Sequence, residues 1–231
     1  MKILSMETST LQGSVSLVID GKLIAEEVSF RQKSHTEIIT VFVDSVLNKA
    51  NLKLSDIDVF AVGQGPGSFT GIRVAANAAK TYAYSFAKPM VTIDSLTLLA
   101  DPAKKLGKPV LAIINAYKNM CYSALFDASG KLVKGPEAVP VRDLSKFVDR
   151  DVVVVGDGWE AFHEYFPAEL TAKVTRDPSL SDQPQASVLG ILAHERALQG
   201  LTLDWKSFIP LYIRASEAEE TKKGILITPL K

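Results

Sequence analysis

The order of the expected secondary structure repeats once along the chain, and this repeat limits the fold more than any other feature. In the first hundred residues, three strand-like runs rich in β-branched residues precede a helix, a strand and a second helix. After the turn Leu106-Gly107-Lys108-Pro109 the same order begins again. Strands that alternate with helices favour mixed α/β layers. We therefore predict an α/β protein of two βββαβα halves, residues 1–104 and 105–231, with the boundary near residues 101–109.

Two α/β halves with one element order describe the duplicated actin-like (ASKHA) architecture, which sugar kinases and heat-shock ATPases share. This likeness concerns the fold alone and carries no function. In the first half we expect helices at about 35–51, 69–87 and 95–100. In the second half we expect helices at about 143–149, 159–166 and 186–200, and a last short strand at 209–214.

Charge and cysteine content narrow the function classes. Lys plus Arg equals Asp plus Glu at 26 each, so the chain has no net positive charge with which to hold nucleic acid by itself. Cys121 is the single cysteine, which excludes a disulfide within the chain and suits a reducing compartment. No stretch of about 18 apolar residues is present. We expect a cytoplasmic protein that does not enter a membrane and that contacts RNA mainly through partners.

The segment GQGPGSFTGIRV, residues 63–74, joins an apolar strand to a helix, and we call it the glycine turn. Gly65, Pro66 and Gly67 suit a type II turn, and Ser68 can cap the helix that follows. Free N–H groups at a helix start attract anions, so a candidate anion site comprises Gly65, Pro66, Gly67, Ser68, Thr70 and Arg73. The lysine of a P-loop and the third glycine of the dinucleotide fingerprint are missing. Tight packing and anion binding both remain open.

Two helices flank this turn and carry unusual faces. The second has small residues every four positions, which permits another helix to approach closely. The first begins at the capping box Ser34-His35-Thr36-Glu37 and has an apolar face broader than a sheet requires. Deep burial within one chain explains these faces, and so does a docking surface. The candidate partner-binding residues are His35, Ile38, Val41, Phe42, Ser45, Gly71, Ile72, Ala75, Ala79 and Ala83.

The residues that could carry chemistry are few. In the first hairpin, Glu7, Thr8 and Ser9 offer a carboxylate and hydroxyls, which we interpret as a vestigial phosphate hairpin. The three histidines lack the spacing of a helical metal pair, no G-x-S-x-G motif is present, and we expect no metal site. The segment Gly156-Asp157-Gly158 is a second candidate phosphate turn. A chain without catalysis is the first interpretation, an ATP-binding small-molecule kinase the alternative, and a peptidase-like enzyme a distant third.

At GPGSFTGIR, residues 65–73, the sequence resembles the TsaB (YeaZ) family, and the resemblance covers most of the chain. The opening ILSMETST is similar to the N-terminal motif of the family, and Ser34 to Glu37 match its His-Ser-Glu helix start. The segment PLYIR matches the motif near its C-terminus. There are departures from the pattern. Glu7 stands where the family usually has Asp, and Asn115, Tyr117 and Met120 replace a more charged pattern.

The resemblance implies a non-catalytic subunit of the bacterial machinery that forms threonylcarbamoyladenosine in tRNA. It implies an actin-like fold and pairing with TsaD, the catalytic subunit, through the two helices described above. It also implies a TsaE-like ATPase as a further partner, ATP and a metal ion on the partner subunits and not on this chain, and tRNA contact only within the complex. A homodimer of the isolated chain is a further expectation.

Overall fold

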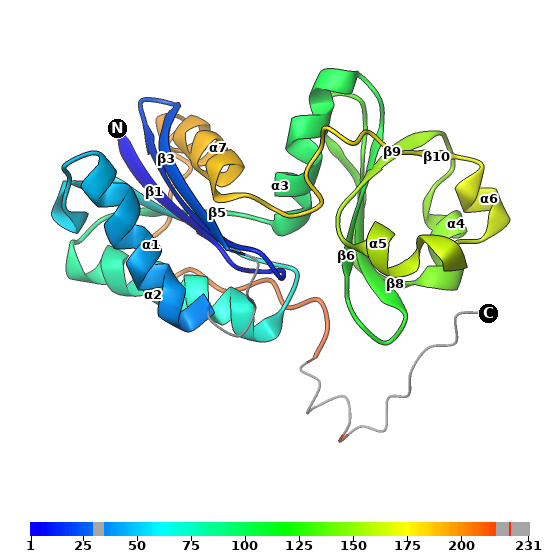
Figure 1. Ribbon diagram of the computed structural model, residues 1–231, viewed down its shortest axis with the longest axis horizontal. Coiled ribbons are helices and arrows are strands. Elements are labelled where there is room, and N and C mark those ends of the chain that lie inside the picture. The colour runs from blue at the N-terminus through cyan, green and yellow to red at the C-terminus, as the bar shows by residue number, and fades with distance from the viewer. Residues whose placement is uncertain (30–34, 216–221, 223–231) are drawn as a thin grey trace. The chain divides into compact units, whose positions relative to one another are not determined.

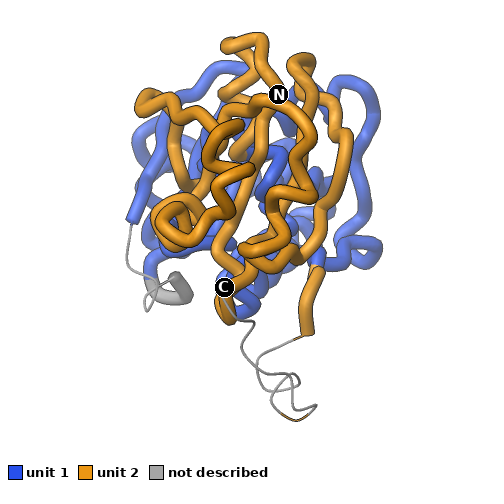
Figure 2. The backbone as a smooth tube through the Cα atoms, turned by 90° about the vertical axis from the view of Figure 1, so that its right-hand side faces the viewer, with its two compact units in different colours: residues 1–98, 184–211 blue, residues 99–183, 212–231 orange. Residues whose placement is uncertain are grey.

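The structure is a computed structural model that describes residues 1–29, 35–215 and 222. The chain forms two compact units, coloured separately in Figure 2. Unit 1 contains residues 1–98 and 184–211, and unit 2 contains residues 99–183 and 212–231. Each unit is built on one five-stranded sheet.

The sheet of unit 1 has the strand order β3-β2-β1-β4-β5, in which β1 is antiparallel to β2 and parallel to β4. Its strands are β1 (Lys2–Glu7), β2 (Gly13–Ile19), β3 (Lys22–Ser29), β4 (Val59–Gly63) and β5 (Met90–Ile93). Helices α1 (His35–Lys49) and α2 (Phe69–Ser85) cover one face, and α7 (Ala186–Leu198) covers the other (Figure 1). Both faces of the sheet are therefore buried, which explains the nearly continuous apolar runs of β1 and β4.

The sheet of unit 2 repeats this order as β8-β7-β6-β9-β10. Its strands are β6 (Val110–Asn115), β7 (Met120–Phe126), β8 (Leu132–Pro140), β9 (Val152–Val155) and β10 (Val174–Thr175). The short helices are α3 (Ser95–Ala100), α4 (Leu144–Phe147), α5 (Gly158–Phe162) and α6 (Ala168–Thr171). Strand by strand, β6 to β10 take the places of β1 to β5, and the predicted duplication of an actin-like α/β fold is confirmed.

Helix α2 begins where the sequence predicts, at Phe69, and α1 is described from His35 onward. Both helices end within two residues of the expected positions. The Ser68 hydroxyl accepts the Gly71 N–H at 3.2 Å, which confirms the predicted cap. Ser34, the first residue of the predicted capping box, lies outside the described residues.

Helix α7 was expected in the C-terminal half, but it packs in unit 1. Its buried residues Leu189 and Ala193 join a core with Ile3 and Val18 on the face of the sheet opposite α1 and α2. The Ala186 N–H donates to the Ser14 hydroxyl at 3.0 Å. The division between the units therefore does not fall at one point near residues 101–109, because the chain returns to unit 1 after residue 183.

The expected strand at 209–214 is also wrong. In this part of the chain, the segment that follows α7 makes one isolated bridge between Leu203 and Met90 and then places Phe208 in the core beneath α2. Lys80 of α2 donates to the Phe208 carbonyl at 2.9 Å. Ile209 is 76% exposed, and the Leu211 N–H donates to the Gln64 carbonyl at 2.7 Å. Residues 209–214 therefore form an irregular segment and not a strand.

Candidate functional site

The glycine turn lies directly against the first hairpin, which connects β1 to β2. A Cβ atom at Gly67 would overlap the carbonyl of Ser9, and one at Gly71 would overlap the carbonyl of Thr8. The Ser68 N–H donates to the Ser9 carbonyl at 2.6 Å, and the Thr8 hydroxyl donates to the Gly71 carbonyl at 2.6 Å. Glycine is therefore required at positions 67 and 71 because two backbone segments meet there.

This contact bears on the candidate anion site at the start of α2. The N–H groups of Ser68 and Gly71 are already bonded within the chain. The Arg73 guanidinium lies 3.8 Å from the centre of the Phe69 ring, which gives this cation an aromatic partner at the helix start. Thr70 is exposed, and Gly65 and Pro66 are buried. Close packing against the hairpin therefore explains most of the features of the glycine turn that also suggested an anion-binding site.

The turn itself differs from the predicted type II geometry. In that turn the third residue has φ near +80°. The φ of Gly67 is 158°, close to extended backbone, and the positive φ falls at Gly65 with 93°. The difference follows from the hairpin, because the backbone at Gly67 must pass beside Ser9.

Glu7, at the end of β1, is fully buried. One carboxylate oxygen accepts the Ser9 N–H at 2.6 Å, and the other accepts the hydroxyl of Ser95 at 3.3 Å. A Cβ atom at Gly63 would overlap this carboxylate. Burial raises the pKa of the Glu7 carboxyl, and hydrogen bonds from Ser9, Ser95 and the backbone of Thr8 act in the opposite direction.

The hairpin in this arrangement does not fit a nucleotide phosphate. The Ser9 N–H and the Thr8 hydroxyl, which could face a phosphate, donate to Glu7 and to Gly71. The Glu7 carboxylate lies among them, and the groups that act on its pKa are hydroxyl and backbone groups rather than cations. The residues of the predicted vestigial phosphate hairpin are thus brought together, with their hydrogen bonds directed inward.

The stripe of small residues on α2 faces the interior of unit 1. Ala75, Ala79 and Ala83 are each 0% exposed and Ile72 is 1% exposed. The three alanines belong to the core that the sheet shares with α1 and α2. The expectation that this stripe binds a partner is therefore corrected: small side chains let α2 lie close to its own sheet. Gly71 is buried for the reason given above, its contact with Thr8.

The candidate residues of α1 lie in different surroundings. Val41 is 62% exposed and points away from the core. Ile38 and Phe42 are half-buried, and Phe42 packs against the core of unit 1. The Ser45 hydroxyl donates to Glu27 of β3 at 2.7 Å. His35 is the first residue of α1, but its side chain lies outside the described part of the structure.

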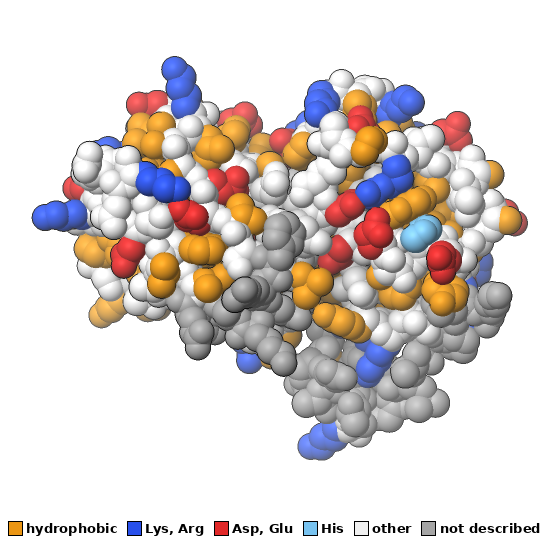
Figure 3. Space-filling view, viewed as in Figure 1, with side chains coloured by type: hydrophobic (Ala, Val, Ile, Leu, Met, Phe, Trp, Pro, Cys, Tyr) orange, Lys and Arg blue, Asp and Glu red, His pale blue; other side chains and the backbone are white. Residues whose placement is uncertain are grey.

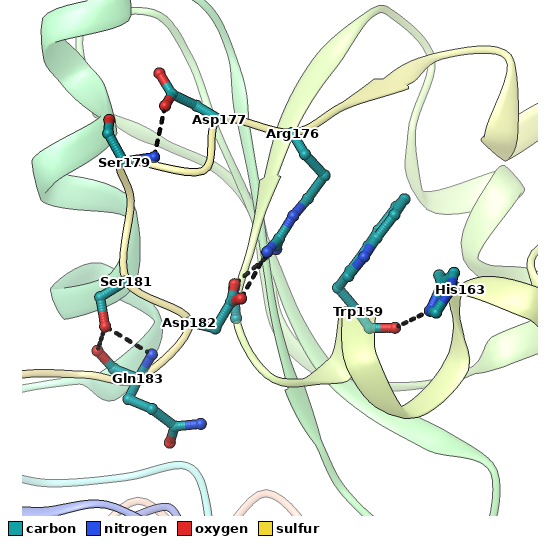
Figure 4. A network of polar contacts seen from close by, with 9 residues as sticks. Trp159, His163, Arg176, Asp177, Ser179, Ser181, Asp182 and Gln183 are labelled. Carbon is teal, nitrogen blue, oxygen red and sulfur yellow. Dashed lines mark hydrogen bonds and ion pairs between the residues drawn. The ribbon is translucent and has the colours of Figure 1, made fainter.

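A second polar cluster, in unit 2, was not recognised from the sequence as a connected group. The Asp157 carboxylate accepts the backbone N–H of Asn115 at 2.8 Å, and Asp182 accepts that of Gly156 at 3.0 Å. Arg176 donates to both oxygens of Asp182 at 2.6 Å, as Figure 4 shows. The motif Gly156-Asp157-Gly158 is the part of the sequence that pointed to this place. It does not indicate which loop packs against the aspartate.

The pKa of Asp157 is raised to about 6, mainly by burial, with a smaller contribution from the neighbouring Asp182 carboxylate, while hydrogen bonds from Asn115 and Gln183 act in the opposite direction. Cys121 lies nearby and is 0% exposed. Burial, together with Asp157, raises the pKa of its thiol. The thiolate is the reactive form of cysteine, so this environment suits a small core residue.

A ring stack of half-buried Trp159 and exposed His163 lies beside this cluster. The Trp159 and His163 rings are 5.1 Å apart and nearly parallel, and the Arg176 guanidinium lies 5.3 Å from the Trp159 ring. The loop also borders an open hollow of about 430 Å³ lined by residues that include Lys108, Thr175 and Arg176. On the face shown in Figure 3, basic and acidic side chains are interspersed rather than gathered by sign.

In the part of the chain that the structure describes, His, Cys, Asp and Glu side chains do not form a group of three or more that could hold a metal ion. Likewise, none of the helices described is both long enough and apolar enough to cross a bilayer.

Comparison with known proteins links this arrangement to one family. The family model of TsaD, tRNA N6-adenosine threonylcarbamoyltransferase, matches residues 24–222. The chain is 30% identical to the tRNA threonylcarbamoyladenosine biosynthesis protein TsaB of Escherichia coli K12, over 97% of this chain and 99% of that protein. It is 29% identical to the TsaB protein of Haemophilus influenzae, over 93% of this chain and 94% of that protein.

A solved structure shows the same relationship. YeaZ from Pseudomonas aeruginosa superposes with a TM-score of 0.80 at 27% sequence identity. The match covers 91% of this chain and 99% of that chain. The two-unit arrangement of strands described above is therefore shared over nearly the whole length.

Proposed function

The chain belongs to the TsaB family, and we propose that it is a non-catalytic subunit of the complex that forms threonylcarbamoyladenosine in tRNA. The observation that carries the proposal is the similarity to Escherichia coli TsaB over 97% of the chain. Buried Glu7, with its oxygens bonded inward, and buried Cys121 support the absence of catalysis by this chain.

The catalytic partner in this proposal is a TsaD-like subunit. The match of the TsaD family model to residues 24–222 supports this, because it makes the chain a homologue of its proposed partner. Homologous subunits commonly associate through equivalent surfaces around an approximate two-fold axis. The same reasoning extends to a homodimer when the chain is alone.

The proposed contact surface is the outward face of α1 and α2, not the buried alanine stripe. Val41 of α1 is 62% exposed and Tyr84 of α2 is 67% exposed. Large apolar side chains that remain exposed on a helix pair are suited to bury surface in a complex. A TsaE-like ATPase would join this assembly, with ATP and metal ion held by the partners. The balanced charge of the chain favours tRNA contact through the complex, in the cytoplasm.

Association with a TsaD-like subunit from the same organism tests the proposal. We expect the untagged partner to co-purify with the tagged chain and Val41→Glu to weaken the association at least tenfold, about 1.4 kcal/mol. Leu198→Glu on α7 is the matched control, because Leu198 is 66% exposed on the opposite face of the sheet. Both variants should fold normally, since exposed substitutions usually change stability by less than about 0.5 kcal/mol.

Absence of any association by wild-type chain would contradict the pairing itself. Equal binding by Val41→Glu and wild type would move the contact away from α1. A loss with Leu198→Glu alone would assign it to the face covered by α7.

A further inference from the structure

Two neighbouring carboxylates connect the end of β9 with the loop between β10 and α7. Asp182 of the loop accepts the Gly156 N–H at 3.0 Å and two hydrogen bonds from Arg176 at 2.6 Å. Asp157 accepts the Asn115 N–H at 2.8 Å and lies close enough to Asp182 for the charge of one carboxylate to act on the other. Arg176 balances the charge of Asp182, whereas the groups that donate to Asp157 are neutral amides.

The side-chain amide of Gln183 is a second group of this loop that reaches Asp157, to which it donates a hydrogen bond. The backbone of Gln183 is fixed by the Ser181 hydroxyl, which accepts the Gln183 N–H at 3.0 Å and donates to the Gln183 carbonyl at 2.9 Å (Figure 4). The Oε1 atom of the Gln183 amide is buried and has no hydrogen-bond partner among the described residues. A buried acceptor in this state is unfavourable, and a donor beside it would relieve the cost.

Protonation of Asp157 supplies such a donor. An ionised carboxylate only accepts hydrogen bonds, whereas a protonated carboxyl group also donates one through its O–H. When Asp157 is ionised, the Gln183 amide donates to it, and Oε1 stays unpaired. When Asp157 is protonated, a half-turn of the amide lets the O–H donate to Gln183 Oε1, and the repulsion between the two carboxylates is lost. The loop is therefore held more firmly when Asp157 carries a proton.

The other titratable groups around Asp157 leave this proton as the one that changes near neutral pH. The pKa of Asp157 is raised to about 6. Cys121 of β7 faces Asp157 and stays neutral, because burial and the carboxylate raise the pKa of its thiol. Glu160 of α5 acts on the pKa of Arg176. His163, directly after α5, belongs to the ring stack beside the loop and is controlled for in the experiment below.

We propose that Asp157 and Gln183 form a proton-dependent latch, which holds the loop of residues 176–183 at the end of β9 when Asp157 is protonated and loosens it when Asp157 is ionised. Gln183 is the last residue of unit 2 before the chain enters unit 1 at Pro184. The latch thus determines how firmly this end of unit 2 is held. The inference goes beyond the proposed function, since it concerns a response of unit 2 to pH.

Amide hydrogen exchange of the full chain at pH 5 and pH 8, corrected for the intrinsic pH dependence of exchange, tests this inference. In wild type, we expect the protection of residues 179–183 to be at least tenfold lower at pH 8 than at pH 5. In Asp157→Asn, the new amide can donate to Gln183 Oε1 at every pH, so protection should be the same at both. Gln183→Met keeps a similar shape without an acceptor, and its protection should be low at both.

His163→Gln is the matched control, because histidine in general changes charge between pH 5 and pH 8. This variant should keep the pH dependence of wild type. An NMR titration gives a second readout: the side-chain amide of Gln183 and the carboxyl carbon of Asp157 should shift with one midpoint, near pH 6. Equal protection of wild type at both pH values would overturn the proposal. So would a pH dependence that persists in Asp157→Asn or in Gln183→Met, or one that disappears in His163→Gln.

Discussion

In unit 2, Asp157 and Tyr117 are each held in a state that costs free energy. Asp157 is a carboxylate surrounded by protein and beside a second carboxylate. Tyr117 has a φ of 56°, in the left-handed region that costs most side chains about 1–2 kcal/mol. Each is tied to the end of β6, Asp157 through the N–H of Asn115 and Tyr117 through the Asn115 side chain.

We predict that Asp157→Asn stabilises the protein at pH 8 and changes little at pH 4. The pKa of Asp157 is raised from 3.8 to about 6, so its stabilising contribution is complete below about pH 4 and is lost as the pH rises through 6. A shift of about two units corresponds to roughly 3 kcal/mol as an upper value. Urea unfolding between pH 4 and 8 measures this. A wild-type profile as flat as that of the variant would contradict the prediction.

Tyr117→Gly should raise the free energy of unfolding by about 0.5–1 kcal/mol, because glycine adopts positive φ without a steric penalty. The side chain is 59% exposed, so little packing is lost. Tyr117→Ala serves as the control, since it removes the same ring and keeps the left-handed cost. Thermal unfolding of the three proteins compares them, and equal stability of the glycine and alanine variants would show that the backbone at this position is not strained.

At the scale of the elements, α2 has a face of small residues that is typical of a helix interface but is buried in the core of unit 1. Its small residues bring it close to the sheet, and Ala79 is 0% exposed. We predict that Ala79→Trp prevents normal folding, because far smaller overpacking already costs about 1–3 kcal/mol. Val41→Trp on the exposed side of α1 should fold as wild type does. Circular dichroism and denaturant unfolding measure both, and a normally folded Ala79→Trp protein would contradict the burial of this face.

At the scale of the whole molecule, the element order and the start of α2 could be predicted, because periodicity and capping are local in the sequence. The unit to which α7 belongs could not be predicted. An apolar face shows that a helix is covered, but not which sheet covers it. The same reason explains the misread stripe around Ala79, since small residues serve a sheet of the same chain as well as a partner helix. The link between Arg176, Asp182 and Asp157 depends on where a loop folds back.

We propose that this chain takes part in tRNA modification without carrying out the chemistry. Transfer of a threonylcarbamoyl group to tRNA can be measured with purified TsaD-like and TsaE-like subunits, ATP and the threonylcarbamoyl donor, with this chain added or left out. The account predicts no transfer by this chain alone, and at least a tenfold increase in transfer when the chain joins both subunits. Transfer by this chain without the TsaD-like subunit, or the same rate with and without the chain, would contradict it.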